Sequence, residues 1–417
     1  MRRKILPLLI STTVLAAAAL TSSRTPGGID AAYRGDLNED GRIDIFDLVG
    51  LVRLIFTQEF GSERLRRLAN VDDSADGKVS LADLMSLVEV FTGRQPRQAV
   101  VFSSAVAGVW AVGDGEKVFR DDLDHRCRES NSIWDGEVIR LAGLYNEVLA
   151  FQVIVSAGLE GASEVEIAVE PPLHAETSRA IGAPGSSPYS PAGGVELFSE
   201  HYLHVQNPTS PLWFYGSPAS APERMTGWIP DALIPQEAMS GRGGFPLEVP
   251  AGCNQGFWVD LYLPRDTLYE AGVYLGRVTV LEQGWEVASI PLEINLLPHY
   301  LPDENHSNVW LYHDSVEPYY PDLSAGQLES MLKHEAHRHR IDLVGGFRAH
   351  YTGFDPQVMD AYKPYLDGSA FTEAAGYQGP GQGEGEHIFP IGMYGSSVLG
   401  DTKEQVQAQS DLWVDWF

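Results

Sequence analysis

Two short acidic loops, 36 residues apart, constrain this chain more than any other feature. The first loop runs from Asp36 to Asp47 and the second from Asp72 to Asp83. Each has a glycine at loop position 6, Gly41 or Gly77, where a calcium loop makes its sharp turn. Calcium takes roughly six to eight oxygen ligands, among them a backbone carbonyl at position 7. Positions 1, 3, 5, 7, 9 and 12 supply the candidate ligands Asp36, Asn38, Asp40, Arg42, Asp44, Asp47, Asp72, Ser74, Asp76, Lys78, Ser80 and Asp83.

Each loop continues into a stretch whose apolar residues recur at helical spacing. A single loop of this kind could be a solvated acidic turn before a helix, whereas two loops in register favour two bound calcium ions. The second site is predicted to be the weaker, because Ser74 and Ser80 replace charged or amide ligands. The apolar positions are Leu48, Leu51, Val52 and Ile55 after the first loop, and Leu84, Leu87, Val88 and Phe91 after the second.

Residues Asp36–Phe56 and Asp72–Phe91 resemble the paired calcium-loop and helix repeats of a dockerin domain. The resemblance implies a small module over residues 31–95, with two antiparallel helices clamped by two calcium ions. It also implies a partner, either a cohesin-like protein or another secreted or cell-surface protein. Loop positions 10 and 11, which often carry hydroxyl residues that read the cohesin, are Ile45-Phe46 and Leu81-Ala82 here, so the partner's identity stays open.

The first 24 residues are typical of an export signal. Met1 to Lys4 is basic, and the apolar stretch from Ile5 to Leu20 contains four consecutive alanines near its end. A retained membrane anchor is the alternative, but the stretch is shorter than the roughly 20 apolar residues that span a bilayer. We therefore expect a secreted, periplasmic or cell-surface protein with no membrane span once the signal is removed.

The net charge of −28 argues against a nucleic-acid partner, because phosphate backbones would repel so acidic a chain. Cys127 and Cys253 are the two cysteines, and the sequence leaves open whether they pair.

A hinge at Gly93–Gln98 precedes a region of alternating apolar and polar residues, residues 99–302. Its β-branched and aromatic content and its Gly, Pro, Asn and Ser turns predict an antiparallel β-sandwich. The strands expected there are Glu147–Ser156, Val165–Glu170, Phe257–Leu263, Val273–Val280 and Ala288–Leu296.

Four phrases in this region occur in a recognisable order: Tyr145–Val155, Trp228–Pro235, Trp258–Val280 and Leu296–Pro302. Together they resemble the β-sandwich that precedes the catalytic barrel in glycoside hydrolase family 123 and in the related domain of unknown function 4091. The resemblance implies that a (β/α)8 TIM barrel follows. Because these phrases are strand ends and turns, we expect Asn146 and Glu147 to be structural; a direct substrate role is the alternative.

Residues 305–417 are predicted to begin that barrel. Strands are expected at Asn308–His313, Ile341–Phe347 and Ile388–Tyr394, and helices at Ser324–Arg338 and Thr402–Phe417. Only about 115 residues follow Pro302, whereas a complete barrel needs roughly 200 to 250. We therefore expect a fragment with about three of the eight strands.

The family resemblance implies an adjacent Asp-Glu pair late in the barrel, acting by substrate-assisted hydrolysis of a terminal N-acetylhexosamine. The adjacent Asp-Glu in this chain is Asp303-Glu304, which precedes the first barrel strand and is predicted to be non-catalytic. The true pair is expected beyond Phe417, so this chain alone is predicted to be inactive. His313 and Asp314, at the end of the first barrel strand, are the best candidates for sugar contact.

Other motifs are weaker. The stretch His334–Arg340 lacks the spacing of a zinc-binding HExxH motif, and we expect a solvated helix end, with His339-Arg340 structural. Gly376–His387 is expected to be a flexible loop at the active-site rim. The sequence thus favours a multidomain secreted glycoside hydrolase-like protein tethered by a calcium module. The alternative is a non-catalytic protein that binds carbohydrate or a cell surface.

Overall fold

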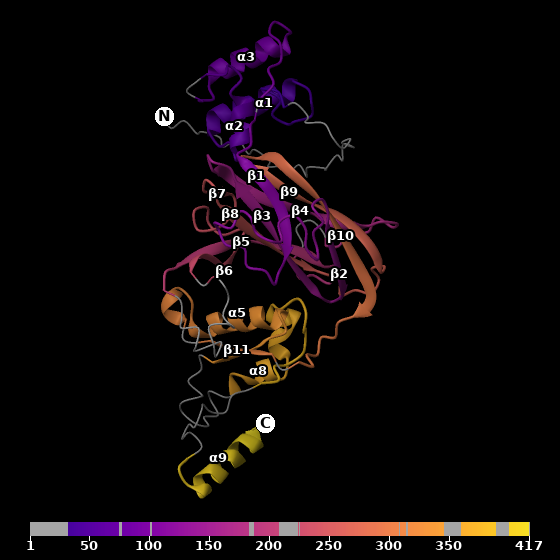
Figure 1. Cartoon of the computed structure of the whole chain (residues 1–417), viewed down its shortest axis with the longest axis vertical. Helices are drawn as coiled ribbons and strands as arrows, with labels where there is room; N and C mark the ends of the chain where they lie inside the picture. The colour runs from indigo at the N-terminus through magenta and orange to yellow at the C-terminus, as the bar shows by residue number, and fades with distance from the viewer. Residues whose placement is uncertain are drawn as a thin grey trace, which may run out of the picture. The chain divides into compact units, whose positions relative to one another are not determined.

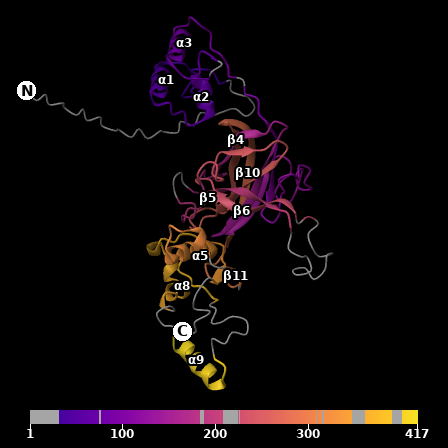
Figure 2. The same ribbon diagram turned by 90° about the vertical axis from the view of Figure 1, so that its left-hand side faces the viewer.

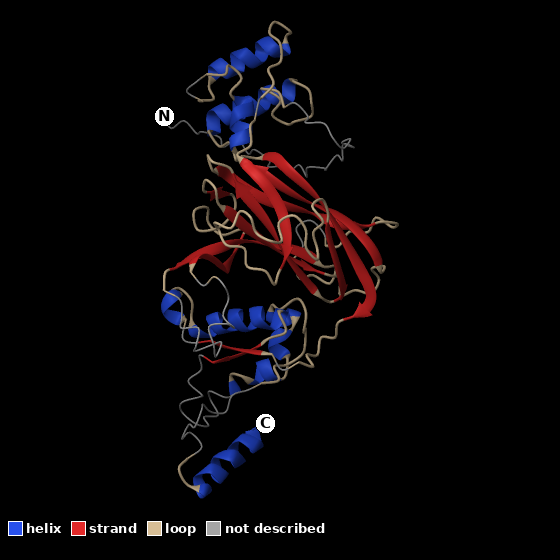
Figure 3. Cartoon of the chain, viewed as in Figure 1, coloured by secondary structure: helices blue, strands red, loops and turns tan. Residues whose placement is uncertain are grey.

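The computed structural model describes residues 32–74, 77–100, 102–182, 187–207, 224, 226–307, 309–313, 316–345, 360–388 and 400–416. The chain divides into two compact units, residues 1–101 and 102–417. In the described part, the first unit is helical and all named strands belong to the second (Figure 3). The export signal at residues 1–24 lies outside the described residues, and the predicted ranges 31–95, 99–302 and 305–417 stay predictions.

The first unit contains helices α1 (Ile45–Thr57), α2 (Glu63–Ala69) and α3 (Leu81–Phe91). Helices α1 and α3 contact each other, and their apolar sides share a small core that includes Leu51, Leu54 and Leu87. Helix α2 was not predicted, because it has only seven residues and no repeated apolar stripe. The ends of the unit meet in an isolated bridge between Tyr33 and Ala99.

The second unit begins with a sandwich of two five-stranded sheets (Figure 1). One sheet has the order β1-β3-β8-β5-β6 and the other β2-β10-β9-β4-β7. The strands are β1 (Val106–Gly113), β2 (Ile139–Tyr145), β3 (Val148–Ala157), β4 (Ala162–His174), β5 (Gly194–Val205), β6 (Gly227–Pro235), β7 (Leu247–Val249), β8 (Asn254–Tyr262), β9 (Gly272–Glu282) and β10 (Trp285–Tyr300).

All five strands expected in this region are present with small shifts at their ends. The fully antiparallel prediction was wrong in one place, because β2 pairs with β10 in parallel, Leu292 opposite Ile139. Alternation along one strand does not reveal whether its partner runs parallel or antiparallel, because side chains alternate with a period of two in either case.

The two faces of the β1-β3-β8-β5-β6 sheet have different roles. Val153 pairs with Phe257 and Phe151 with Val259, and all four side chains are buried in the core between the sheets. The alternate positions, such as Gln152 opposite Trp258, therefore lie on the other face. That outer face is in part covered by the β1–β2 connection, since Gln152 donates to the Glu116 carbonyl and Asn254 to the Asp122 carbonyl. Glu335 of helix α5 (Ala325–Arg338) lies near enough to act electrostatically on Asp260 of the same face.

Beyond the sandwich, β11 (Trp310–His313) and β12 (Asp342–Gly345) form a parallel pair, with α5 between them in sequence. Ser324 caps α5 as expected and forms a capping box with Gln327. Figure 2 shows α5 and β11 from a second side. The remaining elements are η2 (Glu317–Tyr319), α8 (Lys363–Leu366), η3 (Ser369–Phe371), η4 (Glu373–Ala375) and α9 (Lys403–Trp416).

The parallel pair of β11 and β12, with α5 between them in sequence, agrees with the predicted order of strand, helix and strand. The barrel itself stays a prediction. The third expected strand, residues 388–394, lies almost wholly outside the described residues. No helix in the described part of the chain combines the length and the apolar character that a membrane span requires.

Candidate functional site

Two buried carboxylates hold the first acidic loop. Asp36 and Asp47 are only 5% and 1% exposed. The Asp36 carboxylate accepts hydrogen bonds from the backbone N–H groups of Gly41 at 3.0 Å and Asp40 at 3.2 Å. Asp47 accepts one at 2.8 Å from Asp44, the residue that caps α1. Gly41 has φ of 81°, a conformation that a side chain would strain.

The second loop repeats this arrangement. Asp83 is fully buried and accepts the N–H groups of Ser80 at 2.7 Å and Asp72 at 3.1 Å. Asp72 in turn accepts the N–H of Ser74 at 3.0 Å. Gly77 has φ of 61°, so the turn residue plays the same part in both loops.

The other candidate ligands lie nearer the surface. Asn38, Asp40, Arg42, Asp72 and Lys78 are exposed, and Asp44, Ser74 and Ser80 are half-buried. Asp76 lies outside the described residues. Among the described residues, no three His, Cys, Asp or Glu side chains form a group that could hold a metal.

The donor set nevertheless has the chemistry that calcium requires. Burial, and then repulsion from Asp47 and Asp40, raises the pKa of Asp36. Burial and repulsion from Asp72 likewise raise the pKa of Asp83. A bound cation would relieve both effects, and carboxylate and carbonyl oxygens on a glycine turn are suitable calcium ligands. The residue types therefore suit calcium, while in this structure the carboxylates of Asp36, Asp47 and Asp83 accept hydrogen bonds from backbone N–H groups, and calcium binding stays a prediction.

Helices α1 and α3 leave a row of large apolar side chains in solvent, which we call the apolar stripe. It begins at loop positions 10 and 11 of each repeat and continues along the helix. Phe46 is 71% and Phe56 is 83% exposed. The stripe comprises Ile45, Phe46, Val49, Val52, Phe56, Leu81, Met85, Val88 and Phe91.

In the second unit, three of the four phrases that carry the family resemblance meet at one buried polar junction. Asn146 is fully buried and has φ of 66°. Its amide nitrogen donates to the Leu301 carbonyl at 2.9 Å and to Asp303 Oδ1 at 3.0 Å. Its amide oxygen accepts from the Tyr262 hydroxyl at 2.7 Å. Asn146 therefore joins three segments far apart in the sequence, in agreement with its predicted structural role.

Asp303 is fully occupied at this junction. Its carboxylate pairs with Arg265 at 2.7 Å and also accepts from Tyr300 at 3.2 Å and from the Gly381 N–H at 3.0 Å, in addition to Asn146. Its neighbour Glu304 is 57% exposed at the side chain. The four donors tie the Asp303 carboxylate into the junction, and the non-catalytic role of Asp303-Glu304 stays a prediction.

Arg340 completes the junction from the other side. It donates to the carbonyls of Pro302 and, at 3.2 Å, of Asn146. Glu147, the neighbour of Asn146, accepts the Leu144 N–H at 2.7 Å. These side chains fasten the sandwich to the segment that follows it.

The solvated helix end predicted for His334 and His337 was wrong. His337 is only 7% exposed, stacks on Phe371 at 3.6 Å between ring centroids, and donates from Nε2 to the Gly381 carbonyl at 2.9 Å. His334 lies 3.0 Å from the Ala370 carbonyl. Residues 370–381 cover this side of α5, and a helical period cannot reveal a cover made by distant loop residues.

The same packing corrects the flexible loop predicted at residues 376–387. Tyr377 is fully buried, and Gln382 accepts a hydrogen bond from Arg265 at 2.9 Å. Glu386 forms a buried ion pair with Lys333 of α5, 2.5 Å between Oε2 and Nζ. Asp342, the first residue of β12, accepts the N–H of His387 at 3.0 Å and holds the end of this loop.

His337 should make stability depend on pH. Burial lowers its pKa to about 4, whereas an unfolded histidine titrates near 6.5. Its contribution is therefore complete above pH ~6.5 and is lost as the pH falls toward 4, on the order of 3 kcal/mol in all. We expect His337→Gln to show a smaller loss of unfolding free energy between these pH values in urea titrations. The exposed His299→Gln should match the parent chain, and an equal loss in all three proteins would contradict the assignment.

The remaining candidates are only partly described. His313 ends β11 opposite Gly345, and Asp314 lies outside the described residues, so their role in sugar contact stays a prediction. Cys127 and Cys253 are both free thiols here.

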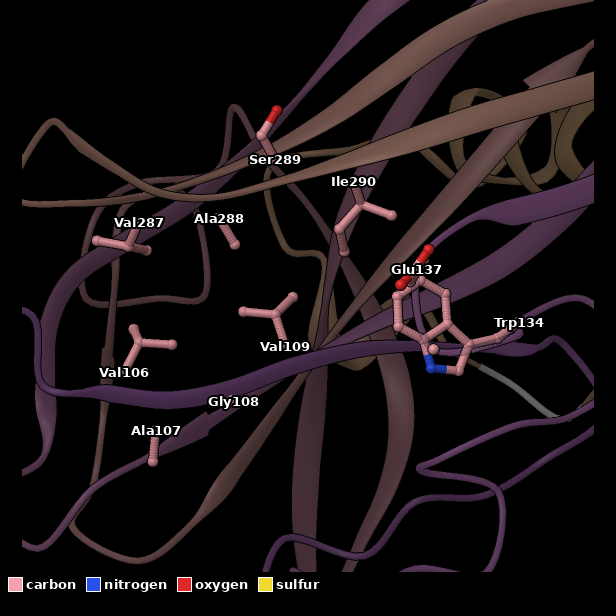
Figure 4. A pocket seen from close by; sticks show the side chains of 11 residues that line it. Val106, Ala107, Gly108, Val109, Trp134, Glu137, Val287, Ala288, Ser289 and Ile290 are labelled. Atoms are coloured by element: carbon pink, nitrogen blue, oxygen red, sulfur yellow. The ribbon is translucent and has the colours of Figure 1, made fainter. Parts of the chain in front are cut away.

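A shallow groove of about 480 Å³ lies between β1 and the first half of β10 (Figure 4). Val106 and Val109 form one side, Val287 and Ile290 the other. Its mostly aliphatic lining provides no paired carboxylates for acid-base chemistry. The junction, the buried ion pair and this groove were all missed by sequence reasoning, because each is formed by segments that come together only on folding.

No protein-family model matches the sequence, and no curated protein matches it. Among solved structures, the chain is similar to a family 123 glycoside hydrolase from Clostridium perfringens, with 11% identity, a TM-score of 0.41 and 55% of this chain covered. The chain spans 36% of that protein's length. It is also similar to AvmM, which catalyses macrocyclization in alchivemycin A biosynthesis, with 9% identity and a TM-score of 0.20 over 38% of this chain and 86% of that one. A third similarity is to the seventh ScaB type I cohesin from Pseudobacteroides cellulosolvens, with 10% identity and a TM-score of 0.14 over 40% of this chain and 94% of that one.

Proposed function

We propose that the second unit is the sandwich and barrel start of a secreted glycoside hydrolase-like protein of family 123 type. The substrate class is glycans that end in N-acetylhexosamine. The first unit binds two calcium ions and tethers the protein to a cohesin-like or other secreted or cell-surface protein.

The observation that carries the hydrolase-like part is the junction at Asn146. The resemblance rests on separate phrases, and three of them contribute Asn146, Tyr262 and Leu301 to one hydrogen-bonded cluster. Phrases that resembled the family by chance would have no reason to meet in one buried cluster. Their meeting supports the proposal that the barrel start attaches to the sandwich here in the same way as in that family.

The apolar stripe supports the tethering part of the proposal. Contiguous exposed apolar side chains on a soluble protein usually mark an interaction surface. Here the two repeats expose equivalent positions, since Ile45 matches Leu81 and Val49 matches Met85. A partner that covers both helices would bury the large side chains Phe46 and Phe56.

The proposed calcium ligands make an ordered prediction. Asp36→Ala removes a full negative charge from the better site, whereas Ser74→Ala removes only a hydroxyl from the weaker one. We therefore expect Asp36→Ala to lower calcium affinity more than Ser74→Ala, by at least about tenfold at the first site. Calorimetric titration of both variants checks this, and the reverse order would contradict the assigned ligands.

The glycan proposal is tested on the full chain with two measurements. Array or calorimetric binding should favour glycans ending in N-acetylgalactosamine over those ending in galactose, and His313→Ala should weaken that binding. A nitrophenyl N-acetylgalactosaminide should not be turned over above the level of the Asp303→Ala/Glu304→Ala variant, because Asp303 is held by four donors.

The possible outcomes separate the candidate functions. Selective binding without turnover is the expected result. Binding to no acetamido sugar would overturn the substrate class, and turnover by the parent chain alone would restore Asp303-Glu304 as a catalytic pair. Binding to polymers of the cell surface without sugar selectivity would favour the non-catalytic alternative.

A further inference from the structure

Strand β1 is the outermost strand of its sheet, and its sequence does not protect the free edge. An unpaired row of N–H and C=O groups can pair with another chain, so exposed edges usually carry charged residues or prolines, or are very short. The eight residues of β1, Val-Ala-Gly-Val-Trp-Ala-Val-Gly, include neither a charge nor a proline. A bulge between Val106 and Gly108 is the irregularity in its pairing with β3.

The other outermost strands of the two described sheets are protected. Strand β6, at the opposite side of the same sheet, contains Pro230, Asp231 and Pro235. Strand β7 has only three residues, and β2 carries Arg140, which forms an ion pair with Asp135. Strand β1 therefore differs from the other three in leaving its edge open to a further strand.

The free edge of β1 borders the shallow groove shown in Figure 4. The opposite wall is the first half of β10, where residues 285–291 also lack a neighbouring strand, because β2 pairs with β10 only from Leu292 onward. Every residue of 106–109 and of 287–290 lines the groove. Side chains of a strand alternate between its two faces, so an unbroken run of lining residues indicates that strand edges border the groove.

Contacts at both ends of the groove fix the spacing of its walls. At one end, Glu282 of β9 accepts the N–H of Ala105 at 2.9 Å, which ties the start of β1 to the second sheet. At the other end, Asn131 donates to the Ala111 carbonyl at 2.8 Å and to the Trp134 carbonyl at 2.7 Å. Between these ends β1 advances six residues, or about 20 Å, which is room for five or six residues of an added strand.

The walls determine what kind of occupant can enter. Because β10 stands opposite the edge of β1, a second folded copy of the chain cannot lay its own β1 flat against this edge. A single extended segment can enter, with its backbone on β1 and its alternate side chains on Val287 and Ile290. These aliphatic walls favour small aliphatic or β-branched side chains.

The charge of the groove selects among such segments. Glu137 is the charged residue of the lining, it is exposed, and it forms no ion pair within the described part of the chain. Glu286, next to Val287, is exposed as well. The net charge of −28 acts in the same direction. A segment that carries lysine or arginine is therefore attracted, and an acidic one is repelled.

We propose that the groove between β1 and β10 is a docking site for an extended, basic and aliphatic segment of a partner protein. The segment adds a strand to the free edge of β1, packs alternate side chains against Val287 and Ile290, and places a basic residue near Glu137. The inference does not depend on the proposed carbohydrate or calcium binding.

Fluorescence anisotropy with a defined peptide tests the site on the full chain. The probe is fluorescein-labelled Lys-Val-Thr-Val-Thr-Val-Thr, and two further peptides are N-methylated either on the three valines or on the three threonines. Backbone N–H groups of a strand point alternately to its two sides, so only one of the two sets faces β1. We expect saturable binding of the probe, at least about tenfold weaker binding of one methylated peptide, and binding of the other within about twofold.

Two further measurements locate the peptide. Glu137→Gln should weaken binding about threefold, an effect that should vanish when glutamine replaces the peptide's lysine. Glu176→Gln, which removes an exposed charge outside the groove, should match the parent chain. In hydrogen exchange of the parent chain, bound peptide should slow the amides of residues 106–110 about fivefold or more and leave those of β6 unchanged.

Lack of saturable binding at about 1 mM peptide would overturn the proposal. Equal weakening by both methylations would do the same, because strand pairing would then not be involved. Protection of β6 in place of residues 106–110 would assign the peptide to the other edge of the sheet and refute the groove. Protection of β1 that rises with the concentration of the chain alone would show that a second copy occupies the edge, and would refute the proposed partner.

Discussion

Residues 32–101 are expected to be largely unfolded in a chelator and to gain helix when calcium is added. The unit has a small apolar core, and it buries the carboxylates of Asp36, Asp47 and Asp83. Without a cation, burial and mutual repulsion oppose this arrangement, and the pKa values of Asp36 and Asp83 are raised accordingly. The binding free energy of the ion then becomes folding free energy. Far-ultraviolet circular dichroism during a calcium titration measures the effect.

The fragment should extend to residue 101, because Tyr33 bridges Ala99 and the Arg34 N–H donates to the Gln98 carbonyl at 2.8 Å. The matched control is Asp36→Ala/Asp72→Ala, which should stay unfolded at calcium concentrations that fold the parent. Magnesium should be less effective, since it demands a smaller, stricter octahedral site. Full helix content in the chelator would refute the calcium assignment.

Glu386→Ala should destabilise the second unit by about 3 to 5 kcal/mol. Lys333 and Glu386 are each 3% exposed at the side chain, and Lys333 also donates to the Leu343 carbonyl at 3.0 Å. Removal of Glu386 leaves a buried ammonium without its counter-ion. All nine tryptophans lie in residues 102–417, so tryptophan fluorescence in urea reports on this unit without a signal from the first.

Two comparisons make this test specific. Lys333→Met/Glu386→Leu removes both charges together and should recover most of the lost stability. Lys363→Ala breaks the solvent-exposed pair with Asp360 and should change stability by less than about 1 kcal/mol. If Lys363→Ala lowered the free energy of unfolding as much as Glu386→Ala, burial of the Lys333–Glu386 pair would not be the cause of the destabilisation.

Local patterns predicted the regular elements well. The capped start of α5 at Ser324 and the apolar alternation of β3 and β8 depend on neighbours along the chain, and the structure places these elements where expected. The parallel pairing of β2 with β10 was missed, since strand direction depends on connections rather than on alternation. The burial of His337 was missed because its cover, Phe371 and Gly381, comes from residues beyond β12.

The sequence alone determined the acidic loops, their glycine turns and the helices that follow, because ligand spacing and helical period are properties of short segments. It also indicated that Asp303 precedes the strand that became β11. Only the tertiary structure decided what Asp303 does, since Arg265, Asn146 and Gly381 reach it from positions far apart in the chain. The same holds for Glu200: nothing in its strand marks it out. One of its carboxylate oxygens has no hydrogen-bond partner among the described residues, and burial raises its pKa; both arise because Glu200 lies against Gly256 of the neighbouring strand, which it meets only when the sheet has formed.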